Sequence, residues 1–305
     1  VCRFDGKNCQ DGVAGADIKA VEAWKQNRDC SAIITAVLDS GVDTRHPDLS
    51  ANLLPGKNFV GEETTDDPTD DNLHGTHVSG IIGASGSETK GVVGVCQKAA
   101  ILPVKVGSAD GYLTDSDIIE GIDFVASSGA KVVNASFGGG PSSELTKTAI
   151  ANAKDTLFVI AAGNGDWFGN GFSIDNNPVY PASYELDNIV AVAATDNRDN
   201  LGRFSNFGVK SVDIAAPGVN ILSTFPMEPT DFMRNYKIPV ELGAIDGTSM
   251  ATPYVAGAAT LVWAKDPTLS VAQVKAALLK AVDALPALSG KIATGGRLNL
   301  SKLFQ

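Results

Sequence analysis

Histidine is the residue type with the most obvious chemical use in this sequence, because the chain has only three: His46, His74 and His77. His74 and His77 lie in segment 73–82 (LHGTHVSGII), whose apolar residues have helical spacing, so both side chains share roughly one helix face. They could ligate a metal together with Asp39, although the HExxH spacing of a zinc protease helix is absent. Otherwise one histidine is a general base and the other is structural. We expect His46 to be a turn or surface residue.

Polar side chains stand at the ends of several predicted strands. Asp39 ends one strand, Asn134 and Ser136 end another, and Asn164 directly follows a third. Ligands of parallel α/β sheets bind beyond the carboxyl ends of the strands, so these residues could share one site. Taken singly, each is also an ordinary turn residue.

A serine stands at the start of another predicted helix. Segment 246–259 (DGTSMATPYVAGAA) is a Gly-Thr-Ser turn followed by small residues, which allow a helix to pack deep in the fold. Ser249 would then lie where free backbone N–H groups and the helix dipole favour negative charge on an oxygen. We expect Pro253 in about the first turn, where its missing N–H costs least. Read alone, Ser249 is equally an N-cap residue.

The elements that must position these residues alternate between strand and helix. Runs rich in β-branched residues predict strands at 32–38, 99–106, 131–136, 156–161 and 189–194, and helical spacing predicts helices at 114–126 and 142–154. Continuous apolar strands separated by helices indicate an α/β fold with a mainly parallel sheet flanked by helices on both faces. There is no repeat or linker-like tract, so we predict a single domain over residues 1–305.

Composition excludes several classes of partner. The chain has 24 basic and 35 acidic residues, and its net charge of −11 argues against nucleic acid. No run approaches the roughly 18 apolar residues of a membrane helix, so we expect no membrane partner. The first residues, Val1-Cys2-Arg3, lack the pattern of a signal peptide, and we expect a mature chain.

Three motifs in a fixed order carry a family resemblance. Asp39-Ser40-Gly41, His74-Gly75-Thr76-His77 and segment 247–253 (GTSMATP) follow one another, and with them the sequence resembles the subtilisin-like serine proteases, whose chain order is Asp, His, Ser. Further matching segments are 136–139 (SFGG), 161–164 (AAGN), 180–182 (YPA), 204–208 (FSNFG) and 215–218 (AAPG). The resemblance extends from about residue 13 to the end, which leaves 1–12 as an N-terminal extension.

The resemblance implies a subtilisin-like fold and a secreted serine endopeptidase that works by acyl transfer. Ser249 would attack the substrate, His74 would move the proton and Asp39 would hold His74. Asn164 and the backbone N–H of Ser249 would stabilise the oxyanion. His77 would be structural.

Two alternatives stay open. The chain could be a peptide-binding protein of the same fold without catalysis, or a metal-dependent hydrolase that uses His74 and His77. Labelling of Ser249 by a fluorophosphonate, insensitive to chelator, separates the three possibilities.

The resemblance also implies how a polypeptide substrate binds. It would lie as an added strand between 110–112 and 136–139, with its first specificity pocket between 136–138 and 161–163. The residues so assigned are Asp110, Gly111, Tyr112, Ser136, Phe137, Gly138, Gly139, Ala161, Ala162 and Gly163. The resemblance implies that this pocket takes a large apolar or aromatic side chain. Its wall segments, 136–138 and 161–163, contain no acidic residue that would select a basic one, and Val179 near the floor would shrink the pocket. Segments 225–245 and 167–172 (WFGNGF) could reshape the cleft.

The state of the cysteines depends on the function. By size alone, four free thiols in a reducing compartment are the more expected state. A secreted protease, made with a signal peptide and an inhibitory propeptide and acting as a monomer, would instead favour two disulfides. Of three possible pairings we expect Cys2–Cys9 and Cys30–Cys96, the latter joining the N-terminal edges of neighbouring strands.

A calcium site is the last expectation. Asp66, Asp67, Asp70 and Asp71 fall within seven residues before His74, a charge pattern that fits a cation loop and a solvated acidic loop about equally. The resemblance favours calcium in a structural, not catalytic, role. Asp48 would belong to a second site with the loop at 84–90.

Overall fold

One sheet organises the molecule. The computed structural model describes residues 12–86 and 91–304. Its nine-stranded sheet has the order β10-β11-β7-β6-β5-β4-β1-β3-β2, and every pairing is parallel except that of β10 with β11. The strands are β1 (Asp29–Asp39), β2 (Lys57–Asn58), β3 (Lys98–Lys105), β4 (Val132–Ala135), β5 (Leu157–Ala161), β6 (Ile189–Thr195), β7 (Ile214–Pro217), β10 (Val282–Ala284) and β11 (Gly296–Leu298). Two further strands, β8 (Ile221–Thr224) and β9 (Leu242–Ile245), form an antiparallel pair of their own.

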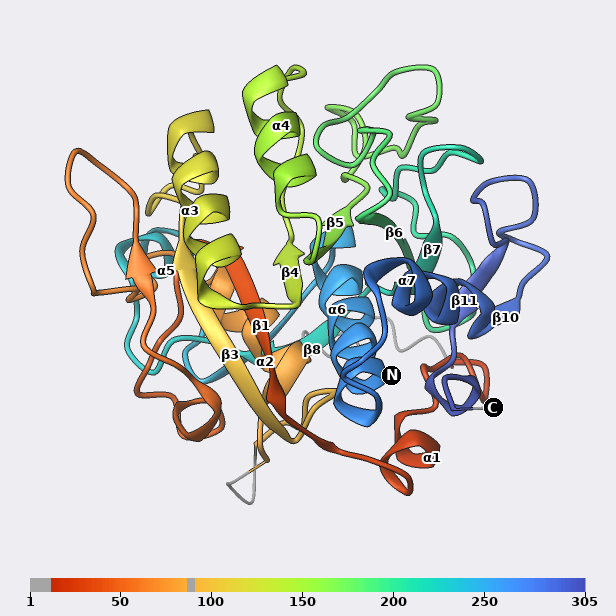
Figure 1. Ribbon diagram of the computed structural model, residues 1–305, viewed down its shortest axis with the longest axis horizontal. Coiled ribbons are helices and arrows are strands. Elements are labelled where there is room, and N and C mark those ends of the chain that lie inside the picture. The colour runs from red at the N-terminus through yellow and green to blue at the C-terminus, as the bar shows by residue number, and fades with distance from the viewer. Residues whose placement is uncertain (1–11, 87–90, 305) are drawn as a thin grey trace.

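Helices cover both faces of the sheet (Figure 1). On one face lie α2 (His74–Gly83), α6 (Thr248–Lys265) and α7 (Val271–Lys280), and on the other α3 (Asp115–Ser128) and α4 (Glu144–Asn152). Shorter helices are α1 (Ala20–Trp24), α5 (Asp231–Tyr236), η1 (Ser50–Asn52) and η2 (Leu300–Lys302). The mainly parallel α/β architecture and the single domain are confirmed.

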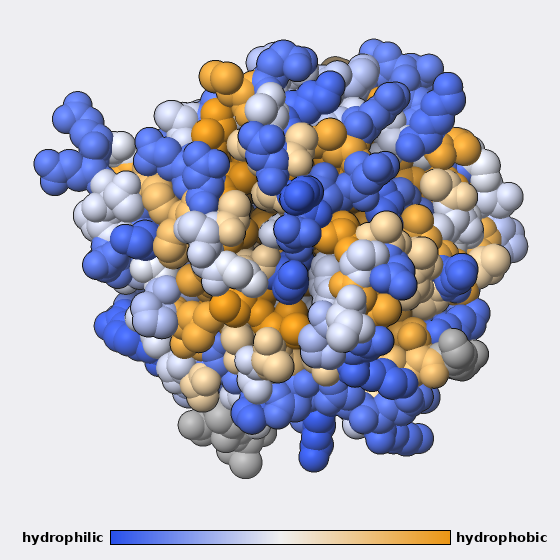
Figure 2. Space-filling model, in the orientation of Figure 1, coloured by the Kyte–Doolittle hydropathy of each residue, from blue (hydrophilic) through white to orange (hydrophobic). Residues whose placement is uncertain are grey.

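Each face of the sheet has its own hydrophobic core. Successive residues of a strand point to opposite faces, so Val37 packs with α6 while Leu38 packs with α3. The two cores bury both faces of the central strands, such as β4, β5 and β6, which explains why those strands are mainly apolar. In the space-filling view, hydrophilic side chains cover the outer helices, and apolar side chains show between them (Figure 2).

The predicted elements are present, with boundaries that differ by a few residues at most. Apolar periodicity did not predict β2, β7 to β11, α1, α5 or α7. Two individual expectations need correction. His46 lies in a turn, as expected, with its backbone N–H donating to the Asp43 carbonyl, but it is only 2% exposed. Its ring accepts a hydrogen bond from the Asp48 N–H and contacts the Glu241 carbonyl. Pro253 lies in the second turn of α6, which begins at Thr248.

One of the two expected disulfides lies in the described residues. Cys30 and Cys96 are bonded, with their Cα atoms 5.8 Å apart, and join the start of β1 to the segment that leads into β3. Cys2, Cys9 and the N-terminal extension lie outside the described residues. Over 12–86 and 91–304, no helix has the length and apolar character needed to cross a membrane.

Candidate active site

The carboxyl end of β1 brings Asp39 to the start of α2. Asp39 Oδ1 lies 2.7 Å from His74 Nδ1 and accepts a second hydrogen bond from the Ser40 N–H. Asp39 is buried and His74 is partly exposed. Burial alone would lower the pKa of His74, but the charge and hydrogen bond of Asp39, with the charge of Asp70, raise it above the usual value. Because Nδ1–H donates to Asp39, the neutral ring presents Nε2 as a base.

A second, fully buried carboxylate supports the same helix start. Asp70 accepts hydrogen bonds from the N–H and hydroxyl of Thr76, from the Asn72 N–H and from the Ser40 hydroxyl. The Ser40 hydroxyl in turn accepts from the Gly75 N–H. Burial raises the pKa of Asp70. This network ties the residue after Asp39 to the residue after His74.

Helix α6 begins at the serine segment. Thr248 and Ser249 are in its first turn, and Ser249 lies at the wall of an open pocket. Pro253 cannot donate to the carbonyl four residues back, and that carbonyl, of Ser249, instead accepts from the Ser136 hydroxyl at 2.9 Å. The proline therefore couples α6 to the end of β4.

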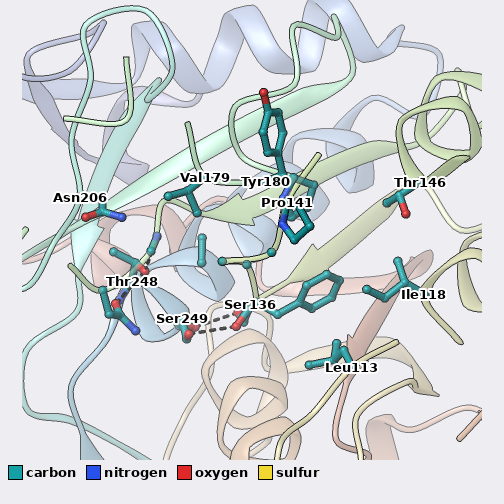
Figure 3. Close-up of a pocket in the computed structure, with 18 of the residues that line it drawn as sticks. Leu113, Ile118, Ser136, Pro141, Thr146, Val179, Tyr180, Asn206, Thr248 and Ser249 are labelled. Atoms are coloured by element: carbon teal, nitrogen blue, oxygen red, sulfur yellow. Dashed lines mark hydrogen bonds between the residues drawn. The ribbon is translucent and has the colours of Figure 1, made fainter. Parts of the chain in front are cut away.

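The Ser249 hydroxyl itself points to the same strand end. Its Oγ donates to the Ser136 carbonyl at 2.9 Å, as the dashed lines in Figure 3 mark. Among the described residues no hydrogen bond joins Ser249 to His74. The structure thus brings Asp39 and His74 into contact, while the Ser249 hydroxyl bonds to the Ser136 carbonyl and not to His74.

Asn164 is oriented by the start of α6. Its Oδ1 accepts from both the N–H and the hydroxyl of Thr248, at 2.8 and 2.9 Å. With Oδ1 fixed by two donors, the Nδ2 amide is the free end of this exposed side chain. The N–H of Ser249 lies in the first turn of α6. It has no acceptor within the helix, because the residue four positions earlier lies outside the helix.

His77 faces away from this cluster. It is fully buried, with Nε2 between the carbonyls of Ile221 and Gly243 at 3.0 and 3.2 Å. Burial lowers the pKa of His77 to about 3, and the charge of His74 adds to this effect. A neutral ring that donates to two carbonyls has the environment of a structural histidine.

A cleft of about 600 Å³ opens beside Ser249. Figure 3 shows Ser136, Val179, Asn206 and Ser249 around its inner end, and Leu113, Ile118 and Thr146 farther along it. Eight of the ten predicted substrate residues line it: Gly111, Tyr112, Ser136, Phe137, Gly138, Gly139, Ala161 and Gly163. Asp110 lines a neighbouring cavity with Gly111, whereas Ala162 is fully buried in the core.

The five predicted calcium ligands do not come together. Asp66 pairs with Lys57, and Asp71 pairs with the buried Lys105. Asp67 accepts from Thr69, Asp70 belongs to the network at the start of α2, and Asp48 accepts from the Val92 N–H. Over the described residues no group of three or more His, Cys, Asp or Glu side chains could hold a metal ion. This donor set does not fit a calcium ion in the 66–71 loop.

The Subtilase family model matches residues 30–299 of the chain. The chain belongs to the subtilase family. It is 36% identical over 290 residues to thermitase of Thermoactinomyces vulgaris, with 94% of each protein covered. It is also 36% identical over 260 residues to subtilisin DY of Bacillus licheniformis, covering 85% of this chain and 86% of that protein.

Solved structures agree with this assignment. A cold-adapted subtilisin-like serine proteinase superposes with a TM-score of 0.71 at 32% identity, covering 90% of this chain and 89% of the other. Proteases from Pseudoalteromonas arctica give a TM-score of 0.80 at 27% identity, covering 95% and 94%. The protein is therefore a subtilisin-like serine endopeptidase, a hydrolase of peptide bonds.

Proposed function

We propose that this subtilase cleaves polypeptides with Ser249 as nucleophile, His74 as general base and acid, and Asp39 as the anion that orients His74. The observation that carries the proposal is the 2.7 Å contact between Asp39 Oδ1 and His74 Nδ1, in a cavity that shares Ser136 and Phe137 with the cleft that Ser249 lines. That contact fixes the tautomer with Nε2 unprotonated, which the general base must have.

The reaction begins with a rotation of the Ser249 side chain from the Ser136 carbonyl toward His74. Rearrangement of this kind is common, because catalytic hydrogen bonds are often incomplete before substrate binds. Ser249 Oγ then attacks the scissile carbonyl carbon while its proton moves to His74 Nε2. Asp39 stabilises the imidazolium, which next protonates the leaving amine, and water hydrolyses the acyl-enzyme by the same steps.

The tetrahedral intermediates place a negative charge on the former carbonyl oxygen. We propose that Asn164 Nδ2 and the Ser249 N–H donate to it. The two hydrogen bonds from Thr248 hold the Asn164 amide before substrate arrives, so little reorganisation is needed during the reaction.

We also propose that the enzyme is secreted. The Cys30–Cys96 disulfide supports secretion, since such bonds persist in oxidising compartments. We further propose a propeptide as inhibitor and folding aid, and a monomeric mature enzyme. Calcium in a structural role stays a prediction from the family resemblance.

The test compares three single variants. Ser249→Ala and His74→Ala should abolish peptide hydrolysis, and fluorophosphonate should label the parent at Ser249 but not the first variant. His77→Gln, the matched control at the second histidine of the same helix, should still be labelled. Equal loss of activity in both histidine variants together with inhibition by a chelator would favour the metal-dependent hydrolase. A folded parent protein that binds peptides but resists labelling would favour the non-catalytic alternative.

A further inference from the structure

The connection between β8 and β9 is longer than an antiparallel pair requires. Two residues suffice to join such strands, yet here residues 225–241 lie between Thr224 and Leu242 and contain α5. The extra length lets this connection carry side chains away from the β8–β9 pair to another part of the domain.

Several contacts hold α5 against the start of α2. The Thr230 hydroxyl, which also caps α5, donates to the Asn72 carbonyl at 2.7 Å. The Met227 N–H donates to Asp43 Oδ2 at 2.8 Å. Met233 is fully buried in a small core with Leu73. Since Asn72 and Leu73 directly precede His74, α5 has a fixed position beside the proposed general base.

This position places an aromatic ring over a second cavity. The cavity measures about 280 Å³ and is lined by Asp39, His74, Gly107, Leu113, Phe137 and Phe232, among others. Phe232 comes from α5, and its ring packs on that of Tyr236 with centroids 4.8 Å apart. Gly107 adds no side chain, so the cavity stays open where β3 ends.

The path of the bound peptide determines which of its side chains could enter this cavity. Under the proposed function, on which this step rests, an extended peptide lies between the segment after β3 and the segment after β4, with its scissile carbonyl at Ser249. Neighbouring side chains of an extended chain point to opposite sides. If the residue that contributes the scissile carbonyl enters the cleft beside Ser249, the residue before it faces the cavity beside His74.

We propose that Phe232 is a specificity-determining residue, which makes the enzyme prefer a large apolar side chain at the second residue before the scissile bond. Leu113, Phe137 and Phe232 offer apolar contacts from three separate segments, and an aromatic ring in the substrate can pack against the Phe232 ring. Asp39 and Asp110 disfavour an acidic side chain there, since like charges in a partly buried site repel. A small side chain leaves the cavity to water.

The experiment uses four peptides that differ only at this residue, which is Ala, Leu, Phe or Glu. In the parent enzyme, kcat/KM for Phe and Leu should exceed that for Ala by about tenfold or more, the range for apolar discrimination by a pocket, and Glu should be poorest. Phe232→Ala should reduce the Phe-to-Ala ratio to about twofold or threefold. Phe168→Ala is the matched control. It also removes a phenylalanine ring, but that ring is 79% exposed and lines neither cavity, so the Phe-to-Ala ratio should not change.

Two readouts keep the outcomes distinct. Fluorophosphonate labelling reports the Ser249 chemistry independently of the peptide series. A labelled parent without preference, or a labelled Phe232→Ala variant with the parent ratio, would overturn the specificity proposal and leave the proposed function intact. If Phe232→Ala does not fold, Phe232→Leu replaces it. Leucine keeps an apolar side chain at this position but removes the aromatic ring, so it should lower the Phe-to-Leu ratio, and an unchanged ratio would count against the proposal.

Discussion

At the scale of single residues, the donors around Ser249 differ in how firmly they are held. Asn164 is fixed through its carbonyl oxygen by Thr248, whereas the Ser249 hydroxyl donates to the Ser136 carbonyl and, under the proposed mechanism, must turn toward His74. In that mechanism the groups that stabilise charge are in position before the nucleophile is. That order is reasonable, because preorganised donors contribute most to stabilising the transition state.

Asn164→Ala should therefore lower kcat strongly with little change in KM. The expected loss is about 10²–10³-fold, the range known for this donor in a subtilisin of the same family. Steady-state kinetics on a peptide substrate measures it. Asn170→Ala, which removes an exposed amide from the neighbouring loop, serves as the control. A loss that appears mainly in KM would assign Asn164 to substrate binding in the ground state.

Asp70 should affect the pH at which the enzyme becomes active. The base must be neutral, and the raised pKa of His74 places the acid limb of kcat/KM above the usual imidazole value. Asp70 contributes to that increase through its charge, so Asp70→Asn should move the acid limb to lower pH. Asp71→Asn, whose carboxylate is half exposed and pairs with Lys105, should move it less. A pH profile identical to that of the parent would show that Asp70 acts only on packing.

At the scale of elements, the strands and helices that carry the motifs could be predicted, and those that shape the cleft could not. Strands β1, β3, β4, β5 and β6 each contain a run of apolar residues because both faces of the sheet are buried there, and these runs stand out in the sequence. The short strands β7 to β11 are held by long-range pairing, which leaves no local periodicity. Helix α5 has only six residues, and its place beside His74 depends on contacts with Asn72 and Asp43.

The sequence indicated which residues form the candidate site, but not how their side chains are oriented. Motif order identified Asp39, His74, Ser249 and Asn164 as candidates. It could not reveal that the Asp70 carboxylate turns inward to Thr76, because an acidic run looks the same whether its carboxylates face water, a cation or the core. Side-chain direction is decided by tertiary packing.

The junction of α6 with β4 can be tested as a unit. Ser136→Ala leaves the residue 249 carbonyl without its donor, which should cost about 1–3 kcal/mol of unfolding free energy. In Pro253→Ala the restored N–H can donate to that carbonyl, so the same Ser136→Ala change should cost less there. Thermal unfolding of all four combinations, in the inactive Ser249→Ala background, gives the coupling. Strict additivity would exclude the proposed link between the proline and the serine.

At the scale of the whole molecule, the acidic loop at 66–71 raises the question of whether calcium stabilises the fold. Asp66, Asp67 and Asp71 are its exposed aspartates, and all three already have partners. We therefore expect an Asp66→Asn, Asp67→Asn double variant in the Ser249→Ala background to keep the parent's response of Tm to calcium. Differential scanning calorimetry in chelator and in millimolar calcium measures that response. A calcium-dependent increase in Tm that disappears in the double variant would instead assign an ion to this loop, since binding to the folded state alone raises stability.

His77 links the stability of the whole fold to pH. It is fully buried and neutral, with a pKa of about 3 in the folded chain and about 6.5 when unfolded. Below about pH 6.5 the unfolded chain therefore binds a proton that the folded chain does not. The free energy of unfolding is therefore unaffected by the titration of His77 above that pH and decreases as the pH falls toward 3. The total decrease is about 4 to 5 kcal/mol at most.

His77→Gln tests this linkage, because glutamine can still donate to the Ile221 or Gly243 carbonyl but does not titrate. In the Ser249→Ala background, the variant should have a lower Tm than its parent at pH 7 and should lose less Tm between pH 6.5 and 4. His46→Gln, at the other buried histidine outside α2, shows how much of the change comes from replacing any buried ring. Parallel Tm curves for the parent and His77→Gln would mean that His77 is protonated in the folded protein, contrary to its contacts with two carbonyls. The difference in slope between the two curves therefore measures how strongly burial of the His77 side chain on α2 makes the fold sensitive to acid.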